Sequence, residues 1–166
     1  MRVRRRRSTW YEPTVMEHSV VTEFMIAAPR ERVWRVLADT AAYPQWNPLV
    51  RRLRHRGTMV AGRRALISVE LLSGRSPLWI PVTLRCVDHL RELSWEGGVS
   101  RLVHGLHFHR LEDVDDTSTR VVHGETFTGM LTPLFWRQVE PVLRAGYDRF
   151  NQALTARAES LDRLPH

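Results

Sequence analysis

Four side chains that could move a proton or hold a metal ion occur close together in HGLHFHRLEDVDDTSTRVVHGETF, residues 104–127. They are His107, His109, His123 and Glu125. A histidine held by a carboxylate can act as a general acid or base, and histidines with a carboxylate can also bind zinc. The same groups can instead satisfy one another's hydrogen bonds inside a fold. The structural, catalytic and metal-binding interpretations all remain open at this point.

Alternation along the predicted strands indicates where these side chains point. Over 119–129, His123 and Glu125 share a face with Val121 and Phe127, while the opposite face is mainly polar. Because successive side chains of a strand point to opposite faces, we expect these four to point inward. Over 103–112, alternation alone does not decide which face is buried.

The turn DVDDTST between these two strands allows a register in which His109 lies opposite His123 and His107 opposite Glu125. Directly opposed side chains have Cβ atoms about 4.5 to 5.5 Å apart, which permits direct or water-bridged hydrogen bonds. We expect a contact between His107 and Glu125 and no bound metal. A metal is the stricter demand, because three ligand atoms must converge to about 2.0 to 2.2 Å from one point.

The rest of the chain contains the elements that must position these groups. HSVVTEFMIAA, residues 18–28, alternates and is rich in β-branched residues, which predicts a strand. PRERVWRVLAD has apolar residues at helical spacing, and a second short helix follows it, confined by Pro44 and Pro48. Patterns of period two then predict six strands, at 49–56, 63–72, 78–88, 91–97, 103–112 and 119–129.

After TGMLTP the apolar spacing becomes helical again, which predicts one long helix over 133–161. One stripe of this helix holds Phe135, Val139, Val142, Gly146, Phe150 and Ala153. An apolar stripe needs a partner, and the sheet is the only large surface that the sequence offers.

Together with this order of elements, five segments carry a family resemblance: IAAPRERVWRVLADTAAYPQWNPLV (26–50), LSWEGG (93–98), GLHFHRLE (105–112), TRVVHGETFTGML (119–131) and NQALTARAE (151–159). The chain resembles the START-like, helix-grip (SRPBCC) superfamily and its polyketide cyclase/dehydrase branch. The resemblance implies an α+β helix-grip fold, with a seven-stranded curved antiparallel sheet wrapped around the long C-terminal helix and two short helices after the first strand. It also implies that 107, 109 and 111 point inward, because an apolar residue is common in the family where His109 stands.

The resemblance implies an apolar cavity between sheet and helix, on the order of a few hundred Å³, the usual range for ligand pockets. The candidate ligand-binding residues are Trp46, Asn47, Val69, Leu71, Ile80, Val82, Leu84, Trp95, His109, His123, Phe127, Val142, Gly146 and Phe150. Trp46 and Asn47 can alternatively plug the rim and cap the backbone before Pro48. Alternation over 78–88 also places Cys86 inside, as a small buried hydrophobe rather than a nucleophile.

The leading functional hypothesis is that the protein binds a small, largely apolar molecule, lipid- or polyketide-like, without a cofactor. The alternative is a cyclase- or dehydratase-type enzyme that uses His107 and Glu125 as an acid-base pair. A weaker alternative is a surface-interaction or nucleic-acid-binding module acting through arginines such as those of RRLRHR, residues 51–56. We expect no nucleic-acid partner, because no aromatic stacking platform or recognition helix accompanies these arginines. The oligomeric state is not indicated.

Length and composition set the outer limits of these hypotheses. At 166 residues and 43% apolar composition, the chain suits a single globular domain, which we place at residues 16–166. The net charge of +7 is concentrated in residues 1–15, an arginine-rich leader that we expect to be disordered, with Met16 as an alternative start. No apolar run approaches the roughly 18 residues that span a bilayer, so we expect a cytoplasmic protein without membrane insertion.

Overall fold

The structure is a computed structural model, and it describes residues 17–71, 76–99 and 101–161. Its elements are β1 (His18–Ile26), α1 (Arg30–Ala38), the 3-10 turn η1 (Thr40–Ala42), α2 (Tyr43–Trp46), β2 (Val50–His55), β3 (Arg64–Val69), β4 (Leu78–Asp88), β5 (Glu92–Val99), β6 (Val103–Asp115), β7 (Ser118–Thr128) and α3 (Thr132–Ser160). The predicted leader, residues 1–15, lies outside the described residues.

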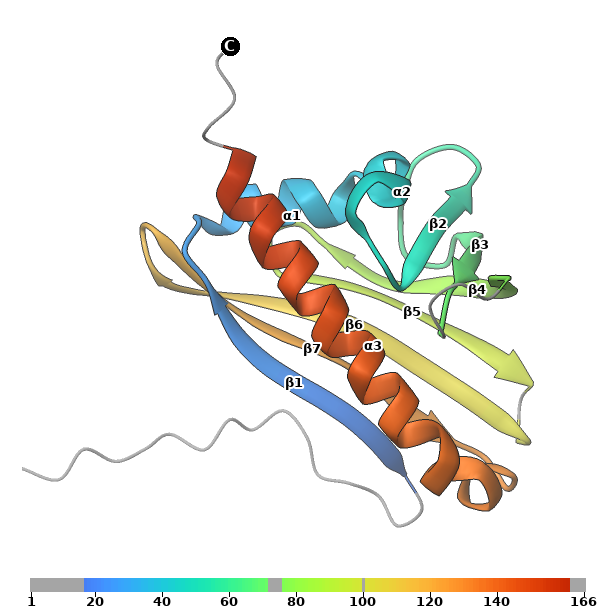
Figure 1. Cartoon of the computed structure of the whole chain (residues 1–166). Coiled ribbons are helices and arrows are strands. Elements are labelled where there is room, and N and C mark those ends of the chain that lie inside the picture. The colour runs from blue at the N-terminus through green and yellow to red at the C-terminus, as the bar shows by residue number, and fades with distance from the viewer. Residues whose placement is uncertain (1–16, 72–75, 100, 162–166) are drawn as a thin grey trace, which may run out of the picture.

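The seven strands form one antiparallel sheet in the order β1-β7-β6-β5-β4-β3-β2. Strands β2 to β7 follow one another as a meander, and β1 pairs with β7 at the opposite edge from β2. The sheet curves around α3, which packs against β1, α1 and β7, while α1 and α2 lie at one end (Figure 1). This arrangement confirms the predicted helix-grip fold, including the two short helices after the first strand.

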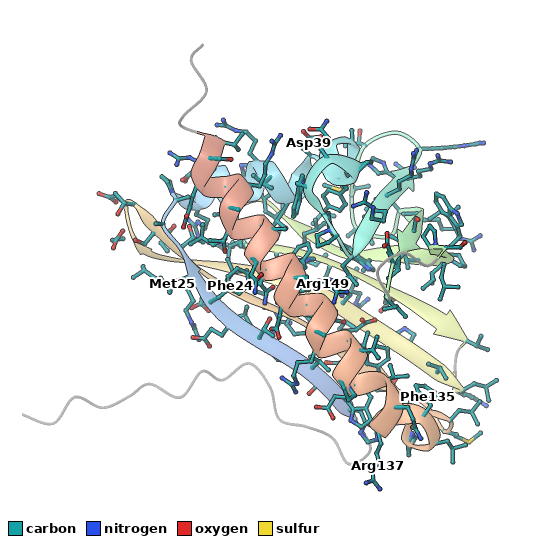
Figure 2. All side chains as sticks on the ribbon, in the orientation of Figure 1. Phe24, Met25, Asp39, Phe135, Arg137 and Arg149 are labelled. Carbon is teal, nitrogen blue, oxygen red and sulfur yellow. The ribbon has the colours of Figure 1, made fainter. Side chains whose placement is uncertain are left out.

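Adjacent residues of β1 show how alternation separates the two faces of the sheet. Phe24 packs against the buried core, whereas Met25 is 50% exposed on the other face (Figure 2). The same rule holds in β7, where Val121 and His123 are fully buried and Val122 between them is only half-buried. The predicted inward face of β7 is therefore confirmed.

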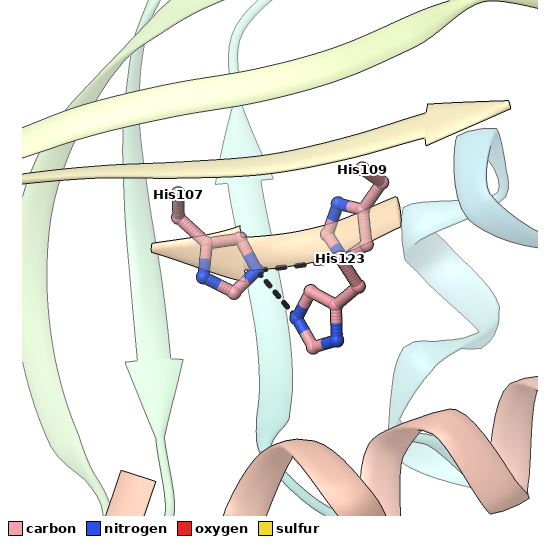
Figure 3. Close-up of side chains that lie close together, drawn as sticks. All are labelled: His107, His109 and His123. Carbon is pink, nitrogen blue, oxygen red and sulfur yellow. Dashed lines mark hydrogen bonds between the residues drawn. The ribbon is translucent and has the colours of Figure 1, made fainter. Parts of the chain in front are cut away.

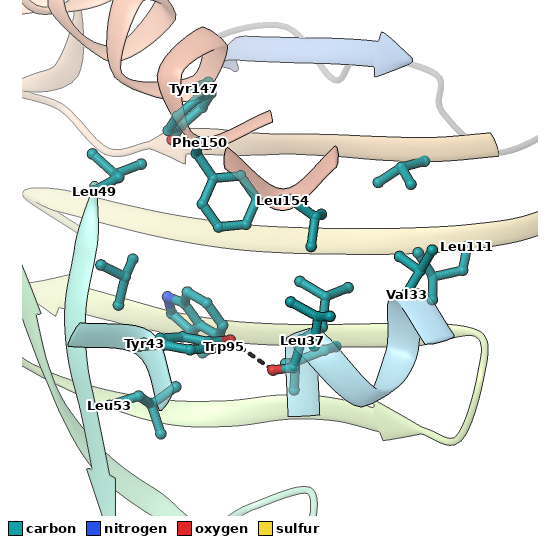
Figure 4. Close-up of a cluster of buried hydrophobic side chains, with 14 of the residues drawn as sticks. Val33, Leu37, Tyr43, Leu49, Leu53, Trp95, Leu111, Tyr147, Phe150 and Leu154 are labelled. Carbon is teal, nitrogen blue, oxygen red and sulfur yellow. Dashed lines mark hydrogen bonds between the residues drawn. The ribbon is translucent and has the colours of Figure 1, made fainter. Parts of the chain in front are cut away.

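The most densely buried part of the core lies at the C-terminal end of α3. Leu154 is fully buried in a cluster that includes Leu37 and Leu111 (Figure 4). The Tyr43 hydroxyl donates a 2.7 Å hydrogen bond to the Leu37 carbonyl and so ties α2 to the end of α1. Towards the N-terminal end of α3, the apolar side chains of Phe135, Trp136 and Val139 are only half-buried. The burial of apolar side chains therefore decreases from the C-terminal end of α3 towards its N-terminal end.

The buried face of α3 differs in part from the predicted stripe. It consists of Thr132, Leu143, Gly146, Tyr147, Phe150, Asn151, Leu154 and Ala158. Gly146 and Phe150 were predicted, but Tyr147 and Asn151 were not, because polar residues do not count towards an apolar stripe. α3 is the longest helix in the described part of the chain, and no helix there is apolar enough over a sufficient length to cross a bilayer.

A β-bulge in β4 makes one predicted side-chain orientation wrong. The register with β5 shifts between Leu84 and Cys86, so one residue is inserted and the alternation reverses. Leu84 is fully buried, as predicted, but Cys86 is half-buried on the opposite face of the sheet. Cys86 is therefore not part of the inward-facing set.

Candidate functional site

Three histidines meet on the inner face of β6 and β7, below α3. The register opposes His109 to His123 and His107 to Glu125, which confirms the predicted pairing. The three rings belong to residues that are 4%, 1% and 0% exposed for His107, His109 and His123. Nε2 of His107 lies 3.4 Å from Nε2 of His109 and 3.3 Å from Nε2 of His123 (Figure 3).

Aromatic rings surround this cluster of histidines. Trp95 stacks on His107, with ring centroids 4.7 Å apart and planes 12° apart. Phe150 of α3 lies against both other rings, 5.1 Å from His109 and 4.6 Å from His123. The structure thus brings two of the predicted ligand-binding residues, Trp95 and Phe150, directly to the histidines.

The Nδ1 atoms of two histidines point away from the cluster towards hydrogen-bond acceptors. Nδ1 of His123 is 2.7 Å from Oδ1 of Asn151, whose Nδ2 donates to Oγ1 of Thr22 at 2.9 Å. The Thr22 hydroxyl donates in turn to the His123 carbonyl at 3.0 Å. Nδ1 of His109 is 3.4 Å from the Leu93 carbonyl. Asn151 therefore ties α3 to β1 and β7 through the site.

Glu125 makes its hydrogen bond to a residue that the sequence did not indicate. The Tyr147 hydroxyl donates to Oε2 of Glu125 at 2.5 Å, while Nδ1 of His107 is 3.6 Å from the same oxygen. The predicted contact between His107 and Glu125 is present, but it is the longer of the two. Gly105 leaves room for the carboxyl group, since a Cβ there would lie 2.5 Å from Oε1. The Glu125 side chain is 20% exposed.

Burial controls the proton affinities of the site. It lowers the pKa of His109 well below its usual range, and charge on His123 and His107 would lower it further. Burial also lowers the pKa of His123, and charge on His107 would lower it further. Burial and the Glu125 carboxyl raise the pKa of Tyr147 well above its usual range. At neutral pH, His109 and His123 are therefore neutral, and the Tyr147 hydroxyl keeps its proton.

Trp46 and Asn47 lie where the short helices meet the sheet, as predicted. Oδ1 of Asn47 accepts from the backbone N–H groups of Leu49 and Val50 at 3.0 and 2.8 Å, so the capped residues follow Pro48 rather than precede it. The Trp46 ring packs 5.6 Å from Phe150. Nε1 of Trp46 and Nδ2 of Asn47 are buried and have no hydrogen-bond partner among the described residues.

The other candidate ligand-binding residues divide by burial. Val82, Leu84 and Gly146 are buried. The half-buried ones are Val69, Leu71, Ile80, Phe127 and Val142. The Leu71 carbonyl accepts a 3.4 Å hydrogen bond from Arg149, which links the end of β3 to α3.

One cavity lies on the outer face of the sheet. It measures about 1000 Å³, and Cys86, Phe108 and Val122 contribute to its walls. Ion pairs cross it, with Arg120 contacting Glu23 at 2.6 Å. A smaller cavity, of about 250 Å³, is next to it. Neither lies between α3 and the sheet, so the predicted interior cavity stays a prediction.

Comparisons with known proteins support the same fold. A family model described as polyketide cyclase / dehydrase and lipid transport matches residues 17–159. The Zhui aromatase/cyclase from Streptomyces sp. R1128 is 21% identical, with a TM-score of 0.71 over 87% of this chain and 94% of that chain. A START superfamily protein from Mycobacterium smegmatis is 18% identical, with a TM-score of 0.69 over 87% of this chain and 99% of that chain.

A plant enzyme shares the same fold at lower sequence identity. Norcoclaurine synthase from Thalictrum flavum is 14% identical, with a TM-score of 0.67 over 91% of this chain and 99% of that chain. No curated protein matches the sequence. At these identities the solved structures show a shared fold alone. The family model, however, spans most of the sequence, and the chain therefore belongs to the polyketide cyclase / dehydrase and lipid transport family.

Proposed function

We propose that the protein binds a small, largely apolar, lipid- or polyketide-like molecule between α3 and the inner face of the sheet. The observation that carries this proposal is the gradient of burial along α3. At its C-terminal end Leu154 and Ala158 are fully buried, whereas Trp136 and Val139 near its N-terminal end pack against the core but stay half-exposed. Accessible apolar surface on an inner face gains free energy when an apolar molecule covers it.

The facing strands have the same gradient. Ile67 and Val82 are buried, but Val69, Leu71 and Ile80, which extend towards the open end, are half-buried and pack against the core. An apolar ligand would therefore lie between these three side chains and the N-terminal half of α3. Phe127 of β7 has a similar exposure and packs 5.7 Å from Trp136.

Polar groups at the edge of this surface support recognition of a polar substituent on the ligand. Nε1 of Trp46 and Nδ2 of Asn47 are buried donors without an acceptor among the described residues. A buried donor left unpaired costs about 1 to 3 kcal/mol, so an oxygen atom of a ligand that pairs with one would recover part of this cost. The partly exposed carboxyl of Glu125 offers an acceptor nearer the histidines.

The proposal can be tested with 1-anilinonaphthalene-8-sulfonate, an apolar fluorescent probe. We expect the protein to bind it, and Ile80→Glu to weaken binding at least tenfold by placing a charge on the half-buried inner surface. Leu66→Glu is the matched control, because Leu66 is 38% exposed in neighbouring β3. Equal probe binding by both variants, with unchanged circular dichroism, would place the probe elsewhere and contradict the proposal.

A second candidate function is proton transfer in an aldol-type cyclisation or dehydration. It is favoured by the arrangement of Tyr147, Glu125 and His107, in which two proton-bearing groups approach one carboxyl oxygen at 2.5 and 3.6 Å. Glu125→Gln should abolish conversion of a poly-β-ketone thioester, followed by mass spectrometry, while probe binding persists. Glu96→Gln, at a half-buried glutamate of β5, is the control and should retain conversion. Conversion unaffected by Glu125→Gln would eliminate this candidate.

A further inference from the structure

The three histidines present Nε2 atoms whose protons can be assigned from their surroundings. Nδ1 of His109 faces the Leu93 carbonyl at 3.4 Å, and a carbonyl can only accept a hydrogen bond. The proton of the neutral ring is therefore on Nδ1. Nε2 of His109 is left as an unprotonated lone pair.

A chain of hydrogen bonds fixes the proton of His123 in the same way. The Thr22 hydroxyl donates its hydrogen bond to the His123 carbonyl, so Oγ1 of Thr22 must accept from Nδ2 of Asn151. Oδ1 of Asn151 then faces Nδ1 of His123 at 2.7 Å and can only accept. His123 is thus protonated on Nδ1, and its Nε2 also carries a lone pair.

His107 has a carboxyl group near its Nδ1, but no hydrogen bond joins the two. Its Nδ1 lies 3.6 Å from Oε2 of Glu125, an oxygen that already accepts from Tyr147. With a proton on this Nδ1, Nε2 of His107 is a third lone pair directed at the other two, whereas a proton on Nε2 would be donated to one of them (Figure 3). Three lone pairs that face one another in a buried space repel, so a positive centre between them would stabilise the first arrangement.

The distances favour a metal ion over a shared proton as this positive centre. Two ligands of a tetrahedral zinc ion, each at about 2.0 to 2.1 Å, are about 3.3 to 3.4 Å apart. Nε2 of His107 is 3.4 and 3.3 Å from its two neighbours, longer than the 2.7 to 3.2 Å typical of a protein hydrogen bond from N–H. The three ligand atoms lie within 4.8 Å of one another, so only the edge between His109 and His123 would need to adjust.

We propose that His107, His109 and His123 bind a divalent transition-metal ion, zinc in the first instance, through their Nε2 atoms. Imidazole nitrogen is a preferred zinc ligand, and two of the three rings already have an outer partner of the kind that orients metal-bound histidines. Asn151 is a positioning residue for His123, and Leu93 supplies the corresponding carbonyl for His109. Three protein ligands leave a fourth position for water or a ligand atom, as in catalytic zinc sites.

The site is independent of the proposed binding of an apolar molecule and is tested with zinc alone. The full chain would be purified without a histidine tag, stripped with chelator, reloaded with zinc chloride and desalted. We expect one zinc per chain by elemental analysis, and a melting temperature that rises with zinc. His107→Ala should weaken binding at least a hundredfold. His104→Ala, at a half-buried histidine of the same strand, should bind as the unaltered chain does.

Two further variants keep the test decisive if His107→Ala fails to fold. Asn151→Ala should lower zinc affinity about 10- to 100-fold, the usual cost of losing an outer partner. Asn151→Asp keeps the accepting oxygen and should retain the affinity. Equal zinc retention by the unaltered chain and His107→Ala would overturn the proposal, as would no zinc above background in the unaltered chain. Equal loss of affinity in Asn151→Ala and Asn151→Asp would reject the positioning role.

Discussion

At the residue scale, the site is one connected network rather than a pair of groups. It runs from Thr22 through Asn151 and His123 to His107, and from there to the carboxyl that accepts from Tyr147. Tyr147 and Asn151 are four residues apart, so both project from one face of α3. The hydrogen bonds of Asn151 with His123 and Thr22, and of Tyr147 with Glu125, fix side-chain positions, so they set where α3 lies on the sheet.

Gly105→Ala would displace Glu125 without changing its chemistry. The new Cβ would lie 2.5 Å from Oε1, so the carboxyl must move and the hydrogen bond from Tyr147 should break. We expect Gly105→Ala and Tyr147→Phe each to reduce the free energy of unfolding by about 1 to 2 kcal/mol. Because both remove the same bond, their effects should not add in the double variant, measured by urea denaturation. Full additivity would show that Glu125 and Tyr147 are not coupled.

At the element scale, the positions of the strands were predictable because period-two alternation is read directly from the sequence. Two boundaries differ by three residues, since β3 ends at Val69 rather than at 72 and β6 runs on to Asp115 rather than ending at 112. The bulge between Leu84 and Cys86 was not, since an inserted residue leaves no mark on composition and depends on pairing with β5. Tyr147 and Asn151 were missed for a related reason. A polar residue on a buried helix face becomes recognisable only when its partner on another element is known.

The turn from β7 into α3 depends on a glycine. Gly129 has φ +117°, and a Cβ there would lie 2.4 Å from the Leu102 carbonyl, which already accepts from Leu131 N at 3.0 Å. We expect Gly129→Ala to destabilise the fold by more than about 2 kcal/mol in denaturant titrations. Gly62→Ala is the control, since φ is +81° but no atom lies within 4 Å, and it should cost about 1 kcal/mol. Equal losses would rule out the backbone contact.

The link between α1 and α2 predicts a loss of stability in alkali. Burial, then charge on Asp39, raises the pKa of Tyr43 above its usual value of about 10, so the folded state holds this proton more tightly than the unfolded chain. Its contribution is complete below about pH 10 and is lost as the pH rises further. Tyr43→Phe should reduce this alkaline slope in thermal melts between pH 9 and 11. A slope that stays the same would assign it to other groups.

At the scale of the whole molecule, the fold could be predicted because the order of strands and helices is itself unusual. The chain has one strand, two short helices, six strands and a long helix, and few arrangements of these elements bury all the apolar faces. The observed seven-stranded sheet around the long helix is such an arrangement. The register that opposes His107 to Glu125 also followed from sequence, since a slip by one residue would expose His123 and Val121. The partners contributed by α3 did not, because they depend on how the helix lies across the sheet.

The molecule is densely packed at one end and keeps accessible apolar surface at the other, on the inner face. The outer depression has a volume of about 1000 Å³, but ion pairs such as Arg110 with Glu92 at 2.9 Å line it. An apolar ligand entering there would have to strip water from these charges without replacing it. We therefore expect an apolar molecule to bind at the inner face and not in the outer depression.

Photo-crosslinking with a fatty acid that carries a diazirine in its tail tests this central claim most directly. After irradiation, digestion and residue-level mass spectrometry, we expect labels on inner-face residues such as Ile80 and Val139, and their loss when unlabelled fatty acid competes. Labels confined to the outer depression, at Cys86 or Val122, would contradict the proposed binding site between α3 and the sheet.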